Sequence, residues 1–312
     1  MTMSAANPSS VLVDSHCHVD SFSPSDWVLV AARALAADVR GCLSAGVWWD
    51  ELQKILMTHH SWIISRGSAK KHGFEALFAE KSGFLVFPSV GLHPMEVARR
   101  WRTQEGCFDE EKANSDIDNF FSVARQFKEF LWAIGETGYD ASREVREGWL
   151  NKDELLRAQS LAFDACVTLS MELKLPVIVH SRSAWEITWK KLEQVKKFGV
   201  ERLMIHCYGG PSADLKKLSS VGYLASFGGV MTWPDAKKMR ESVRQCPSDI
   251  FLLETDSPDL SPVLADGRRP HRNEPAFLKD ILQRTCELRG QSAEELIELN
   301  FSNLAGFFFG KD

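Results

Sequence analysis

Four histidines stand where short apolar runs end, at widely spaced points in the chain. His16 and His18 are separated by a single residue after the first apolar run. In an extended backbone this spacing places both imidazoles on the same face. His180 and His206 each end a later apolar run. Imidazole nitrogens bind Zn, Mn, Fe or Co, so the pattern indicates a metal site, although the His-x-His pair alone is a weak signal.

Two carboxylates also stand directly after apolar runs, as the histidines do. Glu136 follows the apolar run that ends in Gly135, and Asp256 follows the last such run. A single histidine at a strand end is more often a hydrogen-bonded structural group than a ligand. Several imidazoles and carboxylates together favour a metal site instead, because such groups need partners when they are buried and divalent cations would be those partners. The candidate ligands are His16, His18, Glu136, His180, His206 and Asp256.

Six ligands exceed what one catalytic ion with an open position requires. Two divalent ions sharing a bridging carboxylate fit the set better, and such ion pairs serve in-line displacement at phosphorus. The cysteines are scattered and form no Cys-x-x-Cys pair, which argues against a closed structural zinc site. The residues alone therefore favour a hydrolytic binuclear centre.

Short β-branched apolar runs alternate with longer amphipathic segments along the whole chain. The predicted strands are residues 11–14, 41–46, 84–91, 131–135, 176–180, 202–206, 223–228 and 250–254. The predicted helices are residues 26–38, 109–128, 152–173, 184–198, 213–220, 234–246, 273–288 and 292–308. Such alternation is typical of parallel βα units.

About eight βα units predict an α/β fold of the closed (β/α)8 type, a TIM barrel, in which all strand ends meet at one rim. We expect one hydrolase domain over residues 11–312, preceded by a flexible N-terminus at 1–10. Connections 47–83 and 95–130 are long for a minimal barrel, and we expect helical excursions on the rim there. Two C-terminal helices should follow, with Ser292 and Glu295 as a capping box.

Composition limits the function classes. The chain has 312 residues, 44% of them hydrophobic, and its 37 basic and 42 acidic side chains leave a net charge of -5. A protein that grips long duplex DNA usually has the opposite charge bias. No apolar run is long enough to span a membrane, and the N-terminus does not read as a secretory signal. The seven cysteines are scattered and odd in number, which favours reduced thiols and a reducing compartment, either cytoplasm or nucleus. We expect an acidic single-domain barrel of this kind to be a monomer.

Six ordered motifs resemble those of the TatD family of metal-dependent hydrolases. They are VDSHCHVD, GLHP, IGETGYD, PVIVHSR, MIHCYGG and LLETDSP. The likeness runs from about residue 11 to the C-terminus, where LNFSNLAGFF resembles the family's closing helix. The resemblance implies a TIM barrel, a binuclear site for Zn, Mg or Mn, and deoxyribonuclease or related phosphoesterase activity.

The resemblance also implies a role for each motif residue. His16, His18 and Asp256 would hold the first ion, Glu136 would bridge, His180 and His206 would hold the second, and His93 and Arg182 would contact substrate phosphate. Asp256 is the candidate general base for an activated water. His93 would hydrogen-bond the phosphate or protonate the leaving oxygen. Arg182 would either fork onto a phosphate oxygen or form an ion pair at a helix start.

The expected partner is nucleic acid, as a short single strand of DNA or a DNA end. Two cations would offset the acidic character of the chain at the point of binding. Several aromatic residues lie in segments on the rim side, where they would either stack on bases or pack into the core. They are Trp48, Trp49, Trp101, Tyr208 and Trp233.

Two other functions remain open at this stage. Amidohydrolases that act on C–N or lactone bonds also combine a His-x-His pair with a late Asp on barrel strands. Many binuclear members bridge their metals with a carboxylated lysine, whereas Glu136 stands at that position here. A non-catalytic scaffold would use the long connections as binding surfaces, but all six ligand positions are filled.

Overall fold

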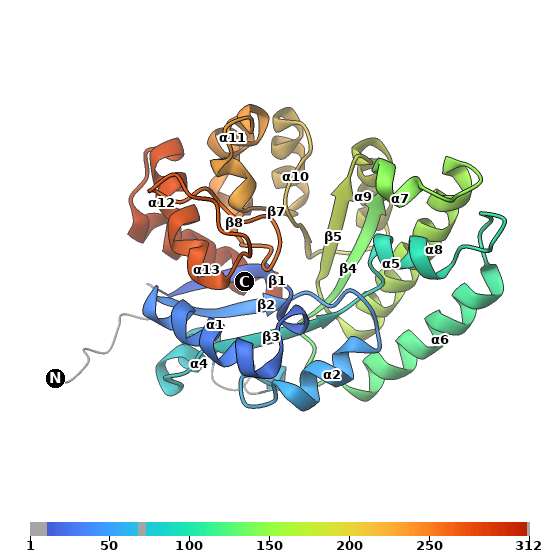
Figure 1. The fold of residues 1–312 in the computed structure, drawn as a ribbon, viewed down its shortest axis with the longest axis horizontal. Coiled ribbons are helices and arrows are strands. Elements are labelled where there is room, and N and C mark those ends of the chain that lie inside the picture. Colours follow the sequence, from blue (N-terminus) through green and yellow to red (C-terminus); the bar gives the residue numbers. More distant parts are fainter. Residues whose placement is uncertain (1–10, 68–72, 311–312) are drawn as a thin grey trace.

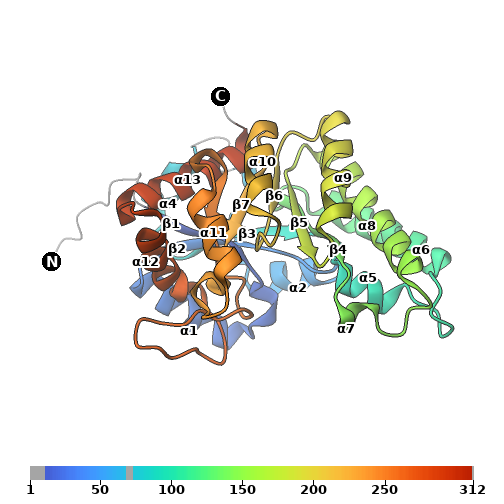
Figure 2. The same cartoon turned by 90° about the horizontal axis from the view of Figure 1, so that it is seen from above.

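The computed structural model describes residues 11–67 and 73–310, so the expected flexible segment 1–10 lies outside the described residues. Eight parallel strands pair in sequence order and are enclosed by helices (Figures 1 and 2). The strands are β1 (Leu12–Cys17), β2 (Val39–Ser44), β3 (Leu85–Val90), β4 (Ala133–Asp140), β5 (Val177–Arg182), β6 (Leu203–Ile205), β7 (Leu224–Phe227) and β8 (Phe251–Leu253). The predicted (β/α)8 barrel is confirmed.

Helices follow the strands on the outside of the barrel. They are α1 (Pro24–Ala36), α2 (Glu51–Thr58), α4 (Phe74–Glu80), α5 (Pro94–Arg100), α6 (Glu110–Gln126), α7 (Arg143–Arg146), α8 (Lys152–Leu173), α9 (Trp185–Lys197), α10 (Leu215–Val221), α11 (Lys237–Gln245), α12 (Leu278–Arg289) and α13 (Ala293–Phe309). Both long connections contain helices, as expected. Among the described residues, no helix is both long and apolar enough to cross a membrane.

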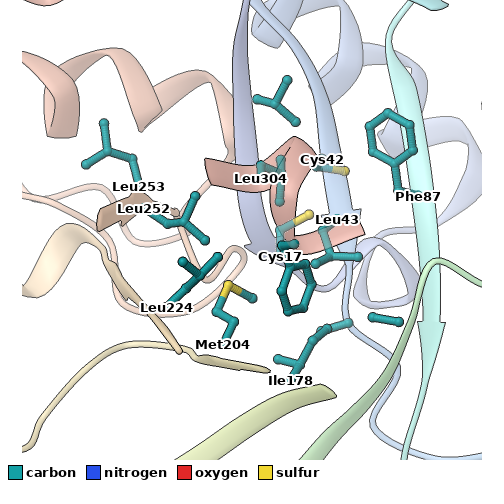
Figure 3. Close-up of a cluster of buried hydrophobic side chains, with 14 of the residues drawn as sticks. Cys17, Cys42, Leu43, Phe87, Ile178, Met204, Leu224, Leu252, Leu253 and Leu304 are labelled. Carbon is teal, nitrogen blue, oxygen red and sulfur yellow. The ribbon is translucent and has the colours of Figure 1, made fainter. Parts of the chain in front are cut away.

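An apolar layer inside the barrel supports a polar layer above it. Figure 3 shows apolar side chains from four consecutive strands lying close together: Ile178, Met204, Leu224 and Leu252. Two residues further along each segment stand polar side chains: His180, His206, Ser226 and Glu254. Residues two apart on a strand share a face, so the same face that fills the barrel presents the chemical groups at its mouth.

Glu136 does not end its strand, contrary to the sequence prediction. β4 continues to Asp140 and stays paired with β5, with Gly138 opposite His180. The close approach depends on glycine, because a Cβ at Gly135, whose φ is +134°, would lie 2.6 Å from the carbonyl oxygen of Ile178. The β4–β5 pair therefore extends past the apolar layer and carries Glu136 in its middle.

The C-terminal helices are confirmed with one shifted boundary. α12 begins at Leu278 rather than at residue 273. The Asn273 amide donates instead to the carbonyl oxygens of Thr255 and Asp259, at 2.6 and 2.7 Å, which ties this segment to the loop after β8. Ser292 and Glu295 form the predicted capping box at the start of α13.

Two backbone hydrogen bonds join β1 to the segment that follows β8, and the described residues form no β-ladder there. The Asp256 N–H donates to the carbonyl oxygen of His16 at 2.9 Å, and the His18 N–H donates to that of Ser257 at 2.7 Å. The Asn300 side chain of α13 spans the seam, since it accepts from the Leu253 N–H and donates to the carbonyl oxygen of Val13, both at 2.8 Å. The seam holds the first and last candidate ligand motifs in register.

Replacing Asn300 by Ala should destabilise the protein. The change leaves a buried N–H and a buried carbonyl without partners, which costs about 2–4 kcal/mol in the free energy of unfolding. Urea denaturation measures the loss. Asn119→Ala, at an exposed position of α6, is the matched control and should stay within about 0.5 kcal/mol of the parent. Equal stability of the two variants would contradict a role for Asn300 in closing the barrel.

Candidate metal centre

The structure brings all six candidate ligands together at the carboxyl end of the barrel, although they come from strands or strand ends far apart in the sequence. They surround one end of a pocket of about 820 Å³. His16 is fully buried beneath it, and His18, Glu136, His180, His206 and Asp256 line it. The separate motifs thus form one chemical centre.

One oxygen of Glu136 faces the histidines of β1. Oε2 lies 3.3 Å from Nε2 of His16 and 3.7 Å from Nε2 of His18. Oδ1 of Asp256 lies 3.4 Å from each of the same two nitrogens. With bonds of about 2.1 Å, donor atoms around a single cation are separated by about 3–3.5 Å. These four side chains therefore have the spacing of one ligand set.

The other oxygen of Glu136 faces a second pair of imidazoles. Oε1 lies 2.8 Å from Nδ1 of His180 and 2.7 Å from Nε2 of His206. The two ring nitrogens are themselves 3.1 Å apart. Glu136 reaches both sets with a different oxygen toward each, whereas Oδ1 of Asp256 lies 3.4 Å from the two β1 nitrogens and only 4.0 Å from Nδ1 of His206. This is the geometry of a bridging carboxylate.

Two histidines are oriented by partners on the far side of their rings. Nδ1 of His18 lies 3.0 Å from the carbonyl oxygen of Ala45, so Nδ1 carries the proton and Nε2 is free to bind a cation. Nε2 of His180 lies 3.4 Å from Oδ2 of the fully buried Asp140, which leaves Nδ1 facing the centre. Such outer contacts fix the tautomer and the plane of a metal-binding imidazole.

His93 has the opposite arrangement. Its Nδ1 accepts the N–H of Met95 at 3.2 Å and thereby caps α5. The proton of the neutral ring is then on Nε2, which lies 3.3 Å from Oε1 of Glu136. Burial lowers the pKa of His93, which favours this neutral form. His93 is therefore a hydrogen-bond donor to the centre, although its position would also allow ligation.

Arg182 lies at the mouth of the pocket, at the end of β5. Its guanidinium pairs with Glu144 of α7, and Nη1 is 3.9 Å from Oδ2 of Asp140. The Arg182 and Glu144 side chains are 52% and 57% exposed, so the ion pair contributes little and can be exchanged for another anion. The ion-pair alternative is thus seen as expected, because Glu144 stands in the first turn of α7.

The electrostatics of the centre follow from burial and mutual charge. Burial opposes the charged form of Glu136, yet the His206, His93 and His16 rings hold the pKa of this carboxyl well below its usual range. Burial likewise opposes protonation of His18, but Asp256 raises its pKa to about 10. The pKa of His206 rises to about 9 against burial, through Glu136. In the absence of metal, protonated His18 and His206 supply the positive charge that cations would otherwise supply.

Divalent cations fit the donor set. Both ring nitrogens of His16 and Oε2 of Glu136 are buried and have no hydrogen-bond partner among the described residues. Such atoms are costly unless something binds them. His16, His18 and Glu136 form one group whose ligand atoms all lie within 4.8 Å of one another. Nitrogen and oxygen donors without thiolate suit Zn, Mn or Mg.

Sequence reasoning missed three buried carboxylates around the centre. Asp14 accepts from the Thr255 N–H and hydroxyl, at 2.9 and 2.5 Å, across the seam between β1 and β8. Asp140 orients His180, as described above. Glu254 accepts the Cys207 N–H at 2.6 Å, and burial raises its pKa to about 8. Their positions within the VDSHCHVD, IGETGYD and LLETDSP motifs were the available signal.

The aromatic candidates separate into two groups. Trp48, Trp101 and Tyr208 are completely buried, so the packing alternative holds for them. Trp233 is half-buried and lines the pocket. Trp49 is half-buried and packs against the second apolar cluster.

Comparison with known proteins identifies the family. A family model described as TatD related DNase matches residues 13–309, which is nearly the whole chain. The chain belongs to the TatD family of metal-dependent hydrolases. YcfH of Escherichia coli (strain K12), named an uncharacterized metal-dependent hydrolase, is 29% identical over 304 residues, which is 95% of each chain. Human TATDN3, named a deoxyribonuclease, is 28% identical over 302 residues, covering 95% of this chain and 94% of its own.

Solved structures of other proteins share the fold. YJJV, a TatD homologue from Escherichia coli, superposes with a TM-score of 0.73 at 23% identity and covers 96% of this chain and 98% of its own. A protein from Saccharomyces cerevisiae named an uncharacterized amidohydrolase gives 0.72 at 17% identity, covering 95% and 99%. Similarity at this level of identity extends to the barrel architecture and not to the substrate.

The metal-free TatD-family chain should lose thermal stability as pH rises from 7 to 10. His18 and His206 have folded pKa values of about 10 and 9, above the ordinary 6.5, so protonation stabilises the fold and this contribution disappears in that window. Burial raises the pKa of the Glu254 carboxyl to about 8, so its contribution to stability also decreases as pH rises. Melting curves in the presence of EDTA should shift down by several degrees.

The metal-loaded protein is the control for this prediction. Bound cations replace the protons, so its melting temperature should not fall between pH 7 and 9. Parallel pH dependence with and without metal would show that the histidines do not form the binding site.

Proposed function

We propose that this TatD-family chain is a metal-dependent phosphodiesterase that hydrolyses DNA with two divalent cations. The observation that carries the proposal is the buried Glu136 carboxylate, whose two oxygens face different sets of ligand atoms. Paired cations about 3.5–4 Å apart form the usual clamp for in-line displacement at a phosphodiester. A bridging carboxylate holds cations at that separation.

Each half of the centre supplies one cation site. His16, His18 and Asp256 would hold the first cation, and His180 and His206 would hold the second, with Glu136 shared between them. The cations, whether Zn, Mg or Mn, would activate a water nucleophile and offset charge on the phosphate oxygens. The remaining tasks fall to side chains of the protein.

Three side chains serve the reaction from around the cations. Asp256 is held as an anion, since the His18 contact and nearby imidazoles keep its pKa low against burial, and it accepts the proton of the attacking water. His93, as a neutral Nε2–H donor, hydrogen-bonds a phosphate oxygen rather than protonating the leaving group. Arg182 exchanges Glu144 for the phosphate and binds it through its guanidinium fork.

The substrate is proposed to be a single strand of DNA or a DNA end. The family description and the name of the human relative both point to deoxyribonuclease activity. A net charge of -5 disfavours binding along a duplex, whereas a short strand needs only the local positive charge of two cations and Arg182. Glu136, in place of a carboxylated lysine, favours the phosphodiester over the amide or lactone alternative.

Replacing Glu136 by Gln should remove both metals and activity. The amide keeps the side-chain shape but loses the charge that both cation sites need. Elemental analysis should fall from about two divalent ions per chain toward none, and kcat/KM on DNA should drop by at least about 100-fold. Circular dichroism should be unchanged.

Glu193→Gln, at an exposed position of α9, is the matched control and should retain full metal content and activity. A Glu136→Gln protein that keeps both ions and its turnover would refute the bridging role.

A substrate panel tests the proposed reaction. Purified protein reconstituted separately with Zn, Mg or Mn is assayed on end-labelled single-stranded DNA, duplex DNA, RNA, and a set of amides and lactones. We expect cleavage of single-stranded DNA to exceed duplex cleavage by about tenfold or more, with no turnover of amides or lactones. Hydrolysis of a C–N or lactone bond alone would favour the amidohydrolase alternative, and full metal occupancy without turnover would favour a scaffold.

A further inference from the structure

We propose that Trp233, backed by Arg269, forms a nucleobase-binding subsite beside the metal centre. This inference rests on the proposed function and specifies how the strand is held. The pocket that contains the candidate metal ligands also has an apolar wall, made of Trp233, Met239 and Leu260. A phosphodiester needs only the polar wall, so the apolar wall indicates a second, nonpolar part of the ligand.

The volume of the pocket is consistent with a two-part ligand. About 820 Å³ lies within the range of about 300–1,000 Å³ that small-molecule sites occupy. The cations, the Nε2–H of His93 and Arg182 take the phosphate at one wall. The sugar and base of the adjoining nucleotide then reach the apolar side chains of the lining. A nucleotide joins a charged group to a flat aromatic ring in this way.

The Trp233 ring is held in a fixed orientation. Its Nε1–H donates to the carbonyl oxygen of Ser261 at 2.9 Å, which joins the loop after β7 to the loop after β8. Its own carbonyl oxygen accepts from Nη1 of Arg240 at 2.6 Å. The side chain remains half-buried rather than covered. A rigid and partly accessible indole loses little conformational entropy when a base stacks on it.

Arg269 adds charge to this wall. Its guanidinium carbon lies 3.8 Å from the centre of the Trp233 ring, and its Nε donates to the carbonyl oxygen of Ser261 at 3.2 Å. Ser261 thus accepts from both side chains and holds them stacked. The exposed guanidinium covers one surface of the indole and places a positive charge beside a strand that leaves the pocket. The loop that carries Arg269 is anchored on α1 through Arg272 and Asp26 (Figure 2).

The subsite should accept any base. Stacking on an aromatic side chain tolerates every base because each has a π-face, whereas sequence readout needs hydrogen-bonding groups. Trp233, Met239 and Leu260 are apolar apart from the indole N–H, which is already donated to Ser261, and Arg269 lies behind the indole rather than in the lining of the pocket. We therefore expect sensitivity to the presence of a base next to the cleaved bond and little sensitivity to its identity.

Abasic substrates test the subsite. Short single strands carry a tetrahydrofuran residue on one side or the other of the cleaved phosphodiester, and kcat/KM is compared with that of the unmodified strand. For the parent protein, removing the base on the stacked side should reduce kcat/KM by about 5–150-fold. Trp233→Ala should cleave both strands at nearly equal rates, and Trp233→Phe should recover part of the discrimination.

Trp189→Ala is the matched control. Trp189 is also half-buried and has a cation over its ring, since Nζ of Lys217 lies 5.6 Å from the ring centre, but it does not line the pocket. This variant should discriminate as the parent does. A Trp233→Ala protein that retains the discrimination, or that loses activity equally on both strands, would overturn the subsite while leaving the proposed phosphodiesterase function intact.

Binding without turnover provides an independent measurement. Titration calorimetry of the protein in EDTA with a thymidine tetranucleotide and its abasic counterpart should show tighter binding of the former, by about 5–150-fold per stacked base. Trp233→Ala should abolish that difference. Absence of DNA cleavage by the parent protein would contradict the proposed function, whereas equal binding of both strands would contradict the subsite.

Discussion

A buried carboxylate is the constraint around which the mouth of the barrel is organised. Glu136 is 1% exposed and nevertheless remains an anion, because imidazoles from four other strands or strand ends surround it. Removing a carboxylate from water is unfavourable unless opposite charge or hydrogen bonds compensate it. The surrounding rings are themselves oriented by Ala45, Asp140 and the cap of α5. A network of side chains, rather than one partner, therefore compensates the desolvation of Glu136.

The barrel makes this network possible by separating an apolar layer from a polar layer. The same strands contribute to both, because Ile178 and Met204 of the apolar cluster stand two residues before His180 and His206. Tight packing in the lower layer limits the freedom of the upper one, because neighbouring strands must keep their register. Side chains of Asp14 and Asn300 span the seam between β1 and β8. The fold and the candidate site therefore share their stabilising contacts.

The loops around the mouth of the barrel contribute different groups from those at the strand ends. The strand ends carry groups that would hold cations and phosphate, and these match the motifs of the family. The loops after β7 and β8 contribute Trp233 and Arg269, which are joined through the Ser261 carbonyl. Chemistry and substrate selection can then vary independently, because neither Trp233 nor Arg269 is a candidate ligand.

Strand periodicity and residue type are local properties, so the barrel, the helices of its long connections and the candidate ligands could all be predicted from the sequence. It could not place Glu136 within β4, since the extension of that strand depends on pairing with β5 through Gly138. Nor could it distinguish the packed Trp48 from the pocket-lining Trp233, or predict that His93 caps a helix with Nδ1. Tertiary structure decided these points, because burial, tautomer and shared ligation depend on neighbours that are distant in the chain.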